Sequence, residues 1–253
     1  MKYTVITGAS SGIGYETALA FASRGKNLII VARRKDELEK LKQEIEQINP
    51  NLEVVIRTTD LSVSKNVYEL YEDLKDYQIE TWINNAGFGN FASVADQNLN
   101  KIESMLHVNI EALTIFSSLY ARDYSKVEGT QLINVSSAGG YRILESSVTY
   151  CATKFYVSAF TEGLAQELKA QGANMQAKVL APASTETEFA KRAFDLNDFS
   201  LEGVVPKYHT AKEMAEFMLE LYDSEKVLGI VNGSTYEFEL KDPIFPYAAI
   251  KRS

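Results

Sequence analysis

The sequence predicts a doubly wound α/β fold, in which a parallel sheet of about seven strands carries helices on both faces. Two observations predict it: short β-branched apolar runs recur along the chain, and longer stretches with helical spacing separate them. A crossover of helix length returns the chain in the same direction, so consecutive strands lie parallel and the helices cover the sheet. The runs expected as strands are Tyr3 to Thr7, Leu28 to Val31, Leu52 to Thr58, Thr81 to Ile83, Gln131 to Val135, Met175 to Leu180 and Val227 to Val231.

The stretches between these strands are predicted to be amphipathic helices. Apolar residues recur three or four positions apart, as at Leu38, Leu41 and Ile45, which places them on one helix face. Two longer helices are expected at about Leu99 to Asp123 and Thr149 to Gln171. These helices supply the crossovers that a parallel sheet requires.

One segment departs from this alternation. Residues 186–209 are polar and have no clean period, which is typical of a functional loop rather than of a packed element. We interpret them as a loop or small helical flap that covers the substrate. No linker, repeat or charge block divides the rest, so residues 1–253 are expected to form a single domain.

Composition and charge exclude several classes of protein. Hydrophobic residues make up 45% of the chain and charged residues 24%, which predicts a globular core rather than a disordered chain. The formal net charge of −8 disfavours binding to nucleic acid or to an anionic membrane. One cysteine, Cys151, and two histidines leave no disulfide and no plausible zinc site, so no metal is expected. An apolar strand begins at Tyr3, which leaves no room for a signal peptide, and we expect a cytoplasmic protein.

A glycine-rich turn follows the first predicted strand and opens the first helix. Its sequence runs Thr7-Gly8-Ala9-Ser10-Ser11-Gly12-Ile13-Gly14. Glycines at such a turn let the backbone approach a pyrophosphate, which the free N–H groups and the positive end of the helix dipole then stabilise. A plain strand-to-helix turn would look similar, and the absence of Gly-Lys-Ser/Thr excludes a P-loop.

The same turn also matches the Gly-x-Ser-x-Gly nucleophile elbow of serine hydrolases, with Ser10 as the nucleophile. Such an enzyme would need an oxyanion loop upstream of the serine, and only nine residues precede Ser10. Its base would have to be His107 or His209, and neither lies in a recognisable setting. The hydrolase is therefore kept as a minor alternative.

The residues after the second strand indicate which dinucleotide is preferred. An acidic side chain at this position marks NAD, whereas an arginine accommodates the 2′-phosphate of NADP. Arg33 and Arg34 stand here directly after Ala32, and no acid occupies the strand end. Asp36 and Glu37 follow closely and could reach a ribose, so NAD(H) remains the less favoured alternative to NADP(H).

Among five Tyr-x-x-x-Lys pairs in the chain, context selects Tyr150 and Lys154. This pair opens a long helix, and the helix follows a strand that ends in Ser136-Ser137. The four-residue spacing places both side chains on one face of the helix. A nearby ammonium stabilises a phenolate, so we expect Lys154 to lower the pKa of Tyr150 toward the range useful for proton exchange.

Together these motifs resemble the short-chain dehydrogenase/reductase (SDR) family, in order and along almost the whole chain. The matching segments are the turn Thr7 to Gly14, Asp60-Leu61 after the third strand, Asn84-Asn85-Ala86-Gly87 after the fourth, Asn109 in a helix, Ser137, Tyr150 and Lys154. The resemblance implies a single-domain doubly wound Rossmann fold, hydride transfer between a nicotinamide and a small or medium hydroxyl/carbonyl substrate, and a homodimer or homotetramer.

The resemblance also implies roles for individual residues. Tyr150 would be the general acid/base, Ser137 would orient the substrate oxygen, Lys154 would hold the cofactor ribose, and Asn109 would anchor a water that links Lys154 to solvent. The implied cofactor contacts are Gly8, Ser10, Ser11, Gly12, Ile13, Gly14, Arg33, Arg34, Asp60, Leu61, Asn85, Ala86, Gly87, Tyr150, Lys154, Pro182, Thr185 and Thr187.

The sequence departs from the family pattern after the sixth strand. The family usually has Pro-Gly there, whereas this chain reads Pro182-Ala183, and alanine disfavours a positive φ. The contact expected between Thr187 and the nicotinamide therefore rests on weaker grounds than the catalytic residues. A protein of the same fold that senses NADP(H) without turnover is the main alternative function.

Overall fold

The computed structural model of the protein describes residues 1–196, 198 and 200–248. Within them the strands are β1 (Lys2–Thr7), β2 (Asn27–Ala32), β3 (Val54–Thr58), β4 (Gln78–Asn84), β5 (Gln131–Val135), β6 (Gln176–Ala181), β7 (Thr185–Glu186), β8 (His209–Thr210), β9 (Leu228–Val231) and β10 (Phe238–Lys241). The longer helices are α1 (Gly12–Ser23), α2 (Lys35–Ile48), α3 (Ser64–Asp73), α4 (Leu99–Leu106), α5 (Leu113–Tyr124), α6 (Val148–Ala170), α7 (Glu188–Ala193) and α8 (Ala211–Asp223). Short helical segments are η1 (Val94–Asp96), η2 (His107–Ala112) and η3 (Ala138–Gly140).

The main sheet has the strand order β10-β9-β6-β5-β4-β1-β2-β3 in the described part of the chain. Seven strands, from β3 across to β9, pair in parallel. The predicted doubly wound α/β class and its seven parallel strands are thereby confirmed. An eighth strand, β10, pairs antiparallel with β9 at the sheet edge and was not predicted.

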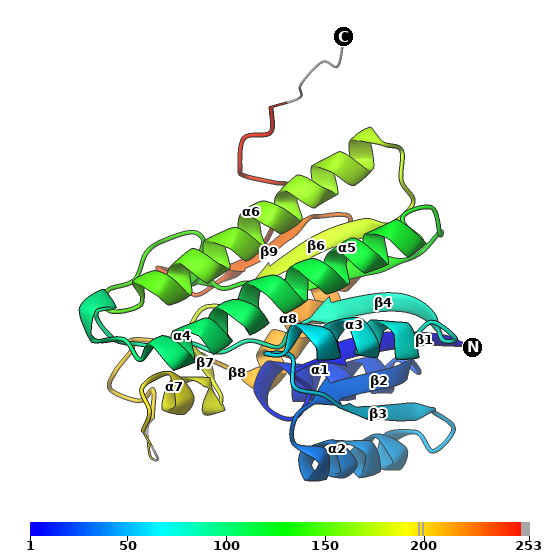
Figure 1. Ribbon diagram of the computed structural model, residues 1–253, viewed down its shortest axis with the longest axis horizontal. Coiled ribbons are helices and arrows are strands. Elements are labelled where there is room, and N and C mark those ends of the chain that lie inside the picture. Colours follow the sequence, from blue (N-terminus) through cyan, green and yellow to red (C-terminus); the bar gives the residue numbers. More distant parts are fainter. Residues whose placement is uncertain (197, 199, 249–253) are drawn as a thin grey trace.

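Each face of the sheet carries its own layer of helices, because both faces of a parallel sheet must be covered. Successive strand residues point to opposite faces, so Val5 joins a core with α3, α5 and α6, whereas Ile6 joins a core with α1, α2 and α8. Figure 1 shows α5 and α6 as two long helices that cross the same face. Within the described residues, no helix has both the length and the apolar character of a membrane span.

The first predicted long helix, Leu99 to Asp123, is divided in the structure. α4 ends at Leu106, the π-helical segment η2 follows, and α5 continues to Tyr124. A π-helical turn contains an extra residue and shifts the helix face, and such turns are frequent at functional sites. The spacing of apolar residues does not reveal this interruption. The second long helix is continuous, as predicted.

The predicted flap at 186–209 is anchored at both ends by a short sheet. β7 and β8 pair in parallel, with Thr185 opposite His209 and Glu186 opposite Thr210. Between them lies α7, and residues 197 and 199 of the flap lie outside the described residues. The flap therefore leaves and returns to the body of the protein at one place, next to the carboxyl end of β6 (Figure 1).

Candidate active site

A cavity of about 600 Å³ lies at the carboxyl ends of the parallel strands. This is where ligands bind in open α/β sheets, because the loops after the strands meet there. The predicted residues that line it are Gly8, Ser10, Ser11, Gly12, Ile13, Arg33, Arg34, Asp60, Leu61, Asn85, Ala86, Gly87, Ser137, Tyr150, Lys154, Pro182, Thr185 and Thr187. Gly14 and Asn109 do not line it, and the structure gives each of them a different position.

The glycine-rich turn holds the chain close to the loop after β4. Gly8 has a φ of +69°, and a Cβ on it would lie 2.8 Å from the backbone of Ala86. A side chain at Gly14 would overlap the Asn85 amide and the Gly8 carbonyl. Gly14 therefore permits close packing of α1 against the strand ends and does not line the cavity, so the prediction of a direct contact at Gly14 is not supported by its position.

Asn85 fastens the two strand ends together. Its side-chain amide donates to the carbonyl oxygens of Thr7 and Gly8, at 2.9 and 3.3 Å. The hydroxyl of Thr7 accepts hydrogen bonds from the backbone N–H groups of Asn85 and Ala86. These bonds place the end of β1, the turn and the end of β4 around one edge of the cavity.

The start of α1 has the chemistry required for a pyrophosphate. Ser11 is the N-cap residue, but its side chain forms no capping hydrogen bond to the helix. The first-turn amides are thus without a side-chain partner, and Ser11, Gly12 and Ile13 all line the cavity. The turn therefore fits a dinucleotide phosphate, both by its open N–H groups and by the glycine-permitted approach.

Arg34 lies beside this turn and is paired with an acidic side chain, that of Glu188. Its guanidinium donates to the Ser10 hydroxyl and carbonyl oxygens, each at 3.2 Å, and forms an ion pair with Glu188 at 3.0 Å. Glu188 begins α7 and also pairs with Arg192 at 2.7 Å. The arginine predicted to read the 2′-phosphate is thus joined to the flap through Glu188, an acid that sequence reasoning did not identify.

The Asp60 carboxylate lies at the same end of the cavity. Its Oδ1 atom accepts from the backbone N–H and the hydroxyl of Ser62, at 3.0 and 2.8 Å. Burial opposes ionisation, but these two hydrogen bonds and the nearby charge of Arg33 outweigh it and lower the pKa of Asp60. Asp60 is therefore a charged acceptor that faces the cavity and shapes the turn that follows β3.

Tyr150 and Lys154 lie one turn apart on α6, both nearly inaccessible to solvent. The Lys154 ammonium is 5.9 Å from the centre of the Tyr150 ring and donates to the Val135 carbonyl, at the end of β5, at 2.9 Å. Ser137, two residues further along the chain, accepts from the Gly139 N–H at 3.0 Å and shares a hydrogen bond with Tyr150. The structure thus brings the predicted phenol, ammonium and hydroxyl together in one cavity.

The predicted lowering of the Tyr150 pKa is wrong for this structure. Burial raises the pKa of the phenol above its usual range, and the Ser137 hydrogen bond opposes that effect only in part. Burial also lowers the pKa of Lys154 to about 8. A desolvated ammonium whose bond goes to the Val135 carbonyl does not offset the cost of burying a phenolate.

Asn109 occupies the π-helical segment η2 and braces the loop after β4. Its side chain donates to the Phe88 carbonyl at 2.9 Å and to the Thr153 hydroxyl at 3.1 Å, and it accepts from the Phe88 N–H at 3.1 Å. A Cβ on Gly87 would lie 3.1 Å from the Asn109 oxygen and 3.4 Å from the Lys154 ammonium. Because Gly87 has no side chain, Asn109 and Lys154 can both lie close to the backbone at that position.

The wall around Tyr150 is apolar and was not predicted as part of the site. Phe91 meets the Tyr150 ring edge-on at 6.0 Å between centres, and Phe189 of α7 lies 5.4 Å from it. Phe88 and Leu144 complete this wall. These residues lie in loops and in the flap, where no periodicity marks them, so only the fold could identify them. The wall keeps the phenol largely away from solvent and gives this part of the cavity an apolar surface.

Thr187, at the base of α7, caps that helix. Its hydroxyl accepts from the Phe189 N–H at 3.2 Å, and a Cβ on Gly12 would lie 2.9 Å from its methyl group. Ala183 is not among the residues with positive φ in the described chain. The flap therefore contacts the glycine turn directly through Thr187, and Ala183 causes no backbone strain.

The hydrolase alternative finds no catalytic base in this site. The Ser10 hydroxyl accepts from Arg34, a cation that cannot remove a proton. His107 pairs with Glu111 on the outer surface of η2, and the ring of His209 packs edge-on against Phe217. Ser10 is therefore placed as a residue of the glycine turn rather than as a nucleophile.

The strand order and the glycine turn at the end of β1 define a Rossmann-type α/β protein. The family model described as short chain dehydrogenase matches residues 2–197. The chain belongs to this family, and the resemblance noted in the sequence is confirmed.

Individual relatives agree with this assignment. The chain is 34% identical to an uncharacterized oxidoreductase of Staphylococcus saprophyticus over 196 residues, which cover 77% of this chain and 78% of that protein. It is 30% identical to human dehydrogenase/reductase SDR family member 11 over 220 residues, 83% of this chain and 82% of that protein. The solved structure of a short-chain dehydrogenase from Sphingobium yanoikuyae in complex with NADPH superposes with a TM-score of 0.83 at 28% identity, covering 91% of this chain and 87% of that one. The chain is thus a member of an oxidoreductase family and has a Rossmann fold.

Proposed function

We propose that the protein is an NADP(H)-dependent oxidoreductase that transfers a hydride between the nicotinamide and a small or medium hydroxyl or carbonyl substrate. One observation carries the proposal: the Tyr150 phenol, the Ser137 hydroxyl and the Lys154 ammonium share a cavity with an anion-binding glycine turn. A proton donor and a dinucleotide cradle in one cavity are what carbonyl reduction requires.

Each residue of the site has a separate role in the proposed reaction. A nicotinamide dinucleotide, when bound in this cavity, would supply the hydride and its electron pair for the carbonyl carbon. Tyr150 gives its phenolic proton to the carbonyl oxygen, and the reverse transfer accompanies alcohol oxidation. Ser137 orients that oxygen by a hydrogen bond, and Lys154 holds the cofactor ribose. Asn109 keeps the loop after β4 in place beside Lys154.

Preference for NADP(H) is supported by the residues after β2. Arg33 and Arg34 line the cavity, and a guanidinium can bind a phosphate with two hydrogen bonds. No acidic side chain occupies the end of β2, where NAD-binding proteins of this fold hold the ribose. The related structure from Sphingobium contains NADPH, which agrees with this assignment.

The remaining cofactor contacts proposed from the sequence surround the same cavity. All of them except Gly14 line the cavity. We assign Asp60 and Leu61 to the adenine, Asn85 to Gly87 to the dinucleotide, and Pro182, Thr185 and Thr187 to the loop beside the nicotinamide, as the family resemblance implies. Gly14 does not line the cavity, and we assign it the close packing of the turn against Asn85 and Gly8. A substrate role for the flap at 186–209 and the single-domain organisation remain predictions.

Replacing Tyr150 with phenylalanine tests the enzyme against the sensor that binds NADP(H) without turnover. Loss of the proton donor should lower kcat by about 10²- to 10⁴-fold, while NADPH binds as before. Tyr68→Phe is the matched control, because it removes the same hydroxyl from an exposed position on α3. An equal kcat in Tyr150→Phe and the parent would show that Tyr150 is not the proton donor. NADPH binding without turnover of any carbonyl by the parent would favour the sensor.

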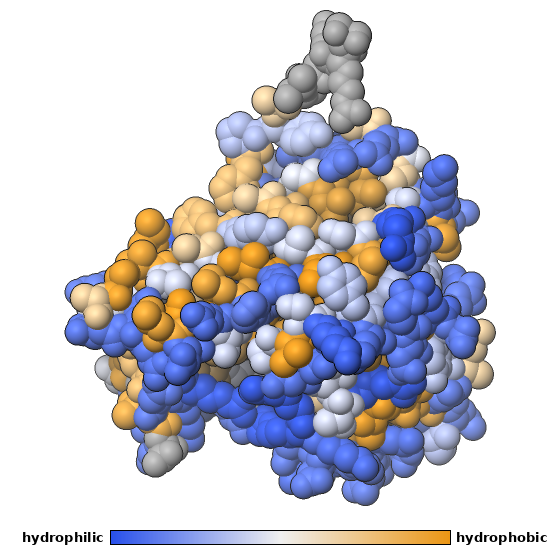
Figure 2. Space-filling model, in the orientation of Figure 1, coloured by the Kyte–Doolittle hydropathy of each residue, from blue (hydrophilic) through white to orange (hydrophobic). Residues whose placement is uncertain are grey.

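A homodimer or homotetramer is part of the proposal. Figure 2 shows apolar residues gathered where α6 lies in Figure 1. On α6 itself, the rings of Tyr156 and Phe160 stack at 5.9 Å between centres, and Tyr156 is exposed. Such a surface is typical of an interface between subunits. Light scattering of the purified protein tests the assembly, and cell fractionation tests the predicted cytoplasmic location.

A further inference from the structure

Arg142 is a cation in the cavity wall that has no charged partner. It lines the cavity in the loop after η3, and it forms no hydrogen bond or ion pair with any described residue. Among the other cations that line the cavity, Arg34 and Arg192 share Glu188, and Lys154 donates to the Val135 carbonyl. Arg33 forms no hydrogen bond or ion pair with a described residue either, but its charge acts on Asp60, at the strand end where the 2′-phosphate is proposed to bind. Arg142 is therefore the remaining guanidinium that is available to a ligand.

The backbone that carries Arg142 is firmly held. The preceding residue, Tyr141, donates its hydroxyl to the fully buried Glu162 at 2.7 Å and stacks on Phe245 at 5.5 Å between ring centres. The other oxygen of Glu162 accepts from the N–H groups of Ile244 and Phe245, at 2.7 and 2.9 Å. This network joins the loop to α6 and to the C-terminal segment, so the position of Arg142 is set by a rigid support.

The space for the guanidinium comes from a glycine on another element. Gly233 lies in the turn between β9 and β10, and a Cβ there would overlap the Arg142 guanidinium. A side chain at 233 would therefore displace the arginine. Two segments, the loop after η3 and the turn before β10, together fix the place of this cation.

Charge at this end of the cavity is uncompensated. The acids that line the cavity are Asp60, held by Ser62, and Glu188, held by two arginines. Neither is paired with Arg142, although the protein as a whole carries a net charge of −8. A single guanidinium fork matches the planar geometry and single charge of a carboxylate.

We propose that Arg142 binds a carboxylate of the substrate, so that the protein acts on apolar oxo acids and the corresponding hydroxy acids. The apolar body of the substrate lies against Phe91, Leu144 and Phe189, and its carbonyl meets Tyr150. This inference rests on the proposed function. In the reduction, the carbonyl carbon gains a hydride, its oxygen gains the Tyr150 proton, the dinucleotide is oxidised, and the carboxylate is unchanged.

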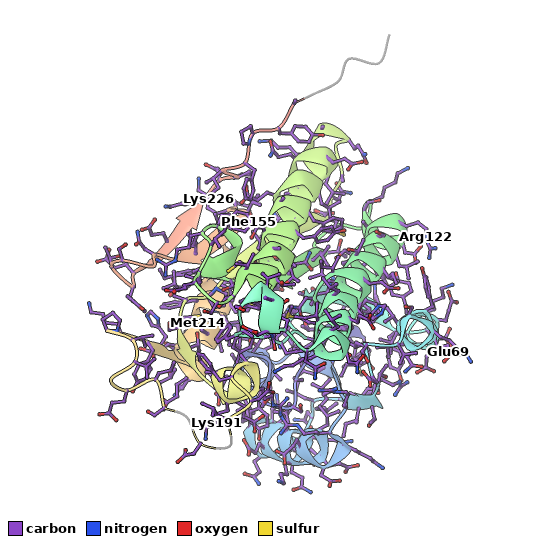
Figure 3. The ribbon with its side chains drawn as sticks, turned by 60° about the vertical axis from the view of Figure 1, so that its left-hand side comes forward. Glu69, Arg122, Phe155, Lys191, Met214 and Lys226 are labelled. Carbon is purple, nitrogen blue, oxygen red and sulfur yellow. The ribbon has the colours of Figure 1, made fainter. Side chains whose placement is uncertain are left out.

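The flap carries two other cations, Lys191 and Arg192, that could bind an acidic group. Arg192 pairs with Glu188, however, and Lys191 lies 4.0 Å from Asp198. Figure 3 places Lys191 on α7, at the outer edge of the molecule. The partners of these flap cations, which only the structure reveals, shift the assignment to Arg142.

The test compares oxo acids with their methyl esters, which keep the body and remove the charge. The probes are 2-, 4- and 5-oxohexanoate and their esters, with NADPH oxidation as the readout. The parent should prefer at least one acid to its ester in kcat/KM. Arg142→Gln should lower that acid-to-ester ratio by about 10- to 100-fold, mainly through KM, because a charge-assisted hydrogen bond is lost. Arg142→Lys should restore part of the ratio.

Arg122→Gln is the matched control. Arg122 lies on α5, far from α7 in Figure 3, and pairs with its neighbour Asp123. Its acid-to-ester ratio should equal that of the parent. If the parent reduces esters as well as acids, or if Arg142→Gln leaves the ratio unchanged, the inference is overturned and the proposed function stands. If no carbonyl is reduced, both fail.

Discussion

Glu188 should limit the affinity of the protein for NADPH, because it occupies the guanidinium proposed to bind the 2′-phosphate. Arg34 donates to Glu188 through two nitrogen atoms, at 3.0 and 3.4 Å. A 2′-phosphate at Arg34 must compete with this carboxylate and is also repelled by it. Glu188→Gln should therefore strengthen NADPH binding and leave NADH binding nearly unchanged.

The size of the effect follows from the exposure of the pair. The side chains of Arg34 and Glu188 are 36% and 47% exposed, so solvent screens their attraction. Such exposed pairs contribute at most about 1 kcal/mol, which corresponds to about a fivefold change in Kd. The difference should shrink as salt is added, because the screening length falls from about 10 Å at 0.1 M toward about 3 Å at 1 M and the attraction between exposed charges weakens.

Isothermal titration of NADPH and NADH into each variant measures this effect. Glu186→Gln is the matched control. Glu186 is exposed, lies two residues before Glu188 and forms no hydrogen bond or ion pair with Arg34. In an Arg34→Ala background, Glu188→Gln should lose its effect on NADPH. Weaker NADPH binding by Glu188→Gln, or equal tightening for NADH, would refute the competition.

Two further predictions concern buried lysines. Burial lowers the pKa of Lys154 to about 8, so raising the pH above that value removes the charge that holds the ribose, and kcat/KM for NADPH should fall there. Lys154→Arg, whose guanidinium stays charged, should remove this fall from the pH–rate profile between about 7 and 10. Lys178 is 2% exposed and donates to the carbonyl groups of Leu221, Tyr222 and Ser224, at 2.6 to 3.1 Å. Lys178→Met should lower the free energy of unfolding in urea by about 2 kcal/mol, because buried carbonyls at the end of α8 lose their donor.

Each lysine prediction has its own control. A profile for Lys154→Arg that falls at the same pH as the parent would assign the ionisation to another group. Lys169→Met changes an exposed lysine in the last turn of α6 and should alter the free energy of unfolding by less than about 0.5 kcal/mol. Equal losses at the two positions would mean that the helix-end contacts of Lys178 do not stabilise the fold.

Much of the fold follows from short-range patterns. The seven parallel strands are visible as apolar runs such as residues 28–31 of β2, because a strand buried on both faces is mostly apolar. The strand β10 escaped notice because an edge strand is only partly buried, as Phe238 and Leu240 are here. The π-helical segment around Asn109 was not predicted either, because a single turn of π-helix has no distinctive residue pattern of its own.

In the candidate site, too, some features could be predicted from short-range patterns and others could not. Ser137, Tyr150, Lys154 and the glycine turn could be selected because each stands at the end of a predicted strand or the start of a predicted helix. The direction of the Tyr150 pKa shift could not be predicted, because it depends on burial, which raises the pKa and outweighs the Ser137 hydrogen bond. The aromatic wall could not be predicted either, since Phe91 and Phe189 lie in segments without periodicity.

By itself, the amino-acid order determined the class of fold, the glycine-rich turn and the Tyr150–Lys154 pair, because each depends on residues only a few positions apart. The tertiary structure decided which charges are paired. Arg34 meets Glu188 across 154 positions of sequence, and Arg142 rests on Gly233 of a different loop. Such contacts form because the crossovers bring distant loops together. Electrostatic energies depend on the resulting distances and burial, and local sequence does not encode these quantities.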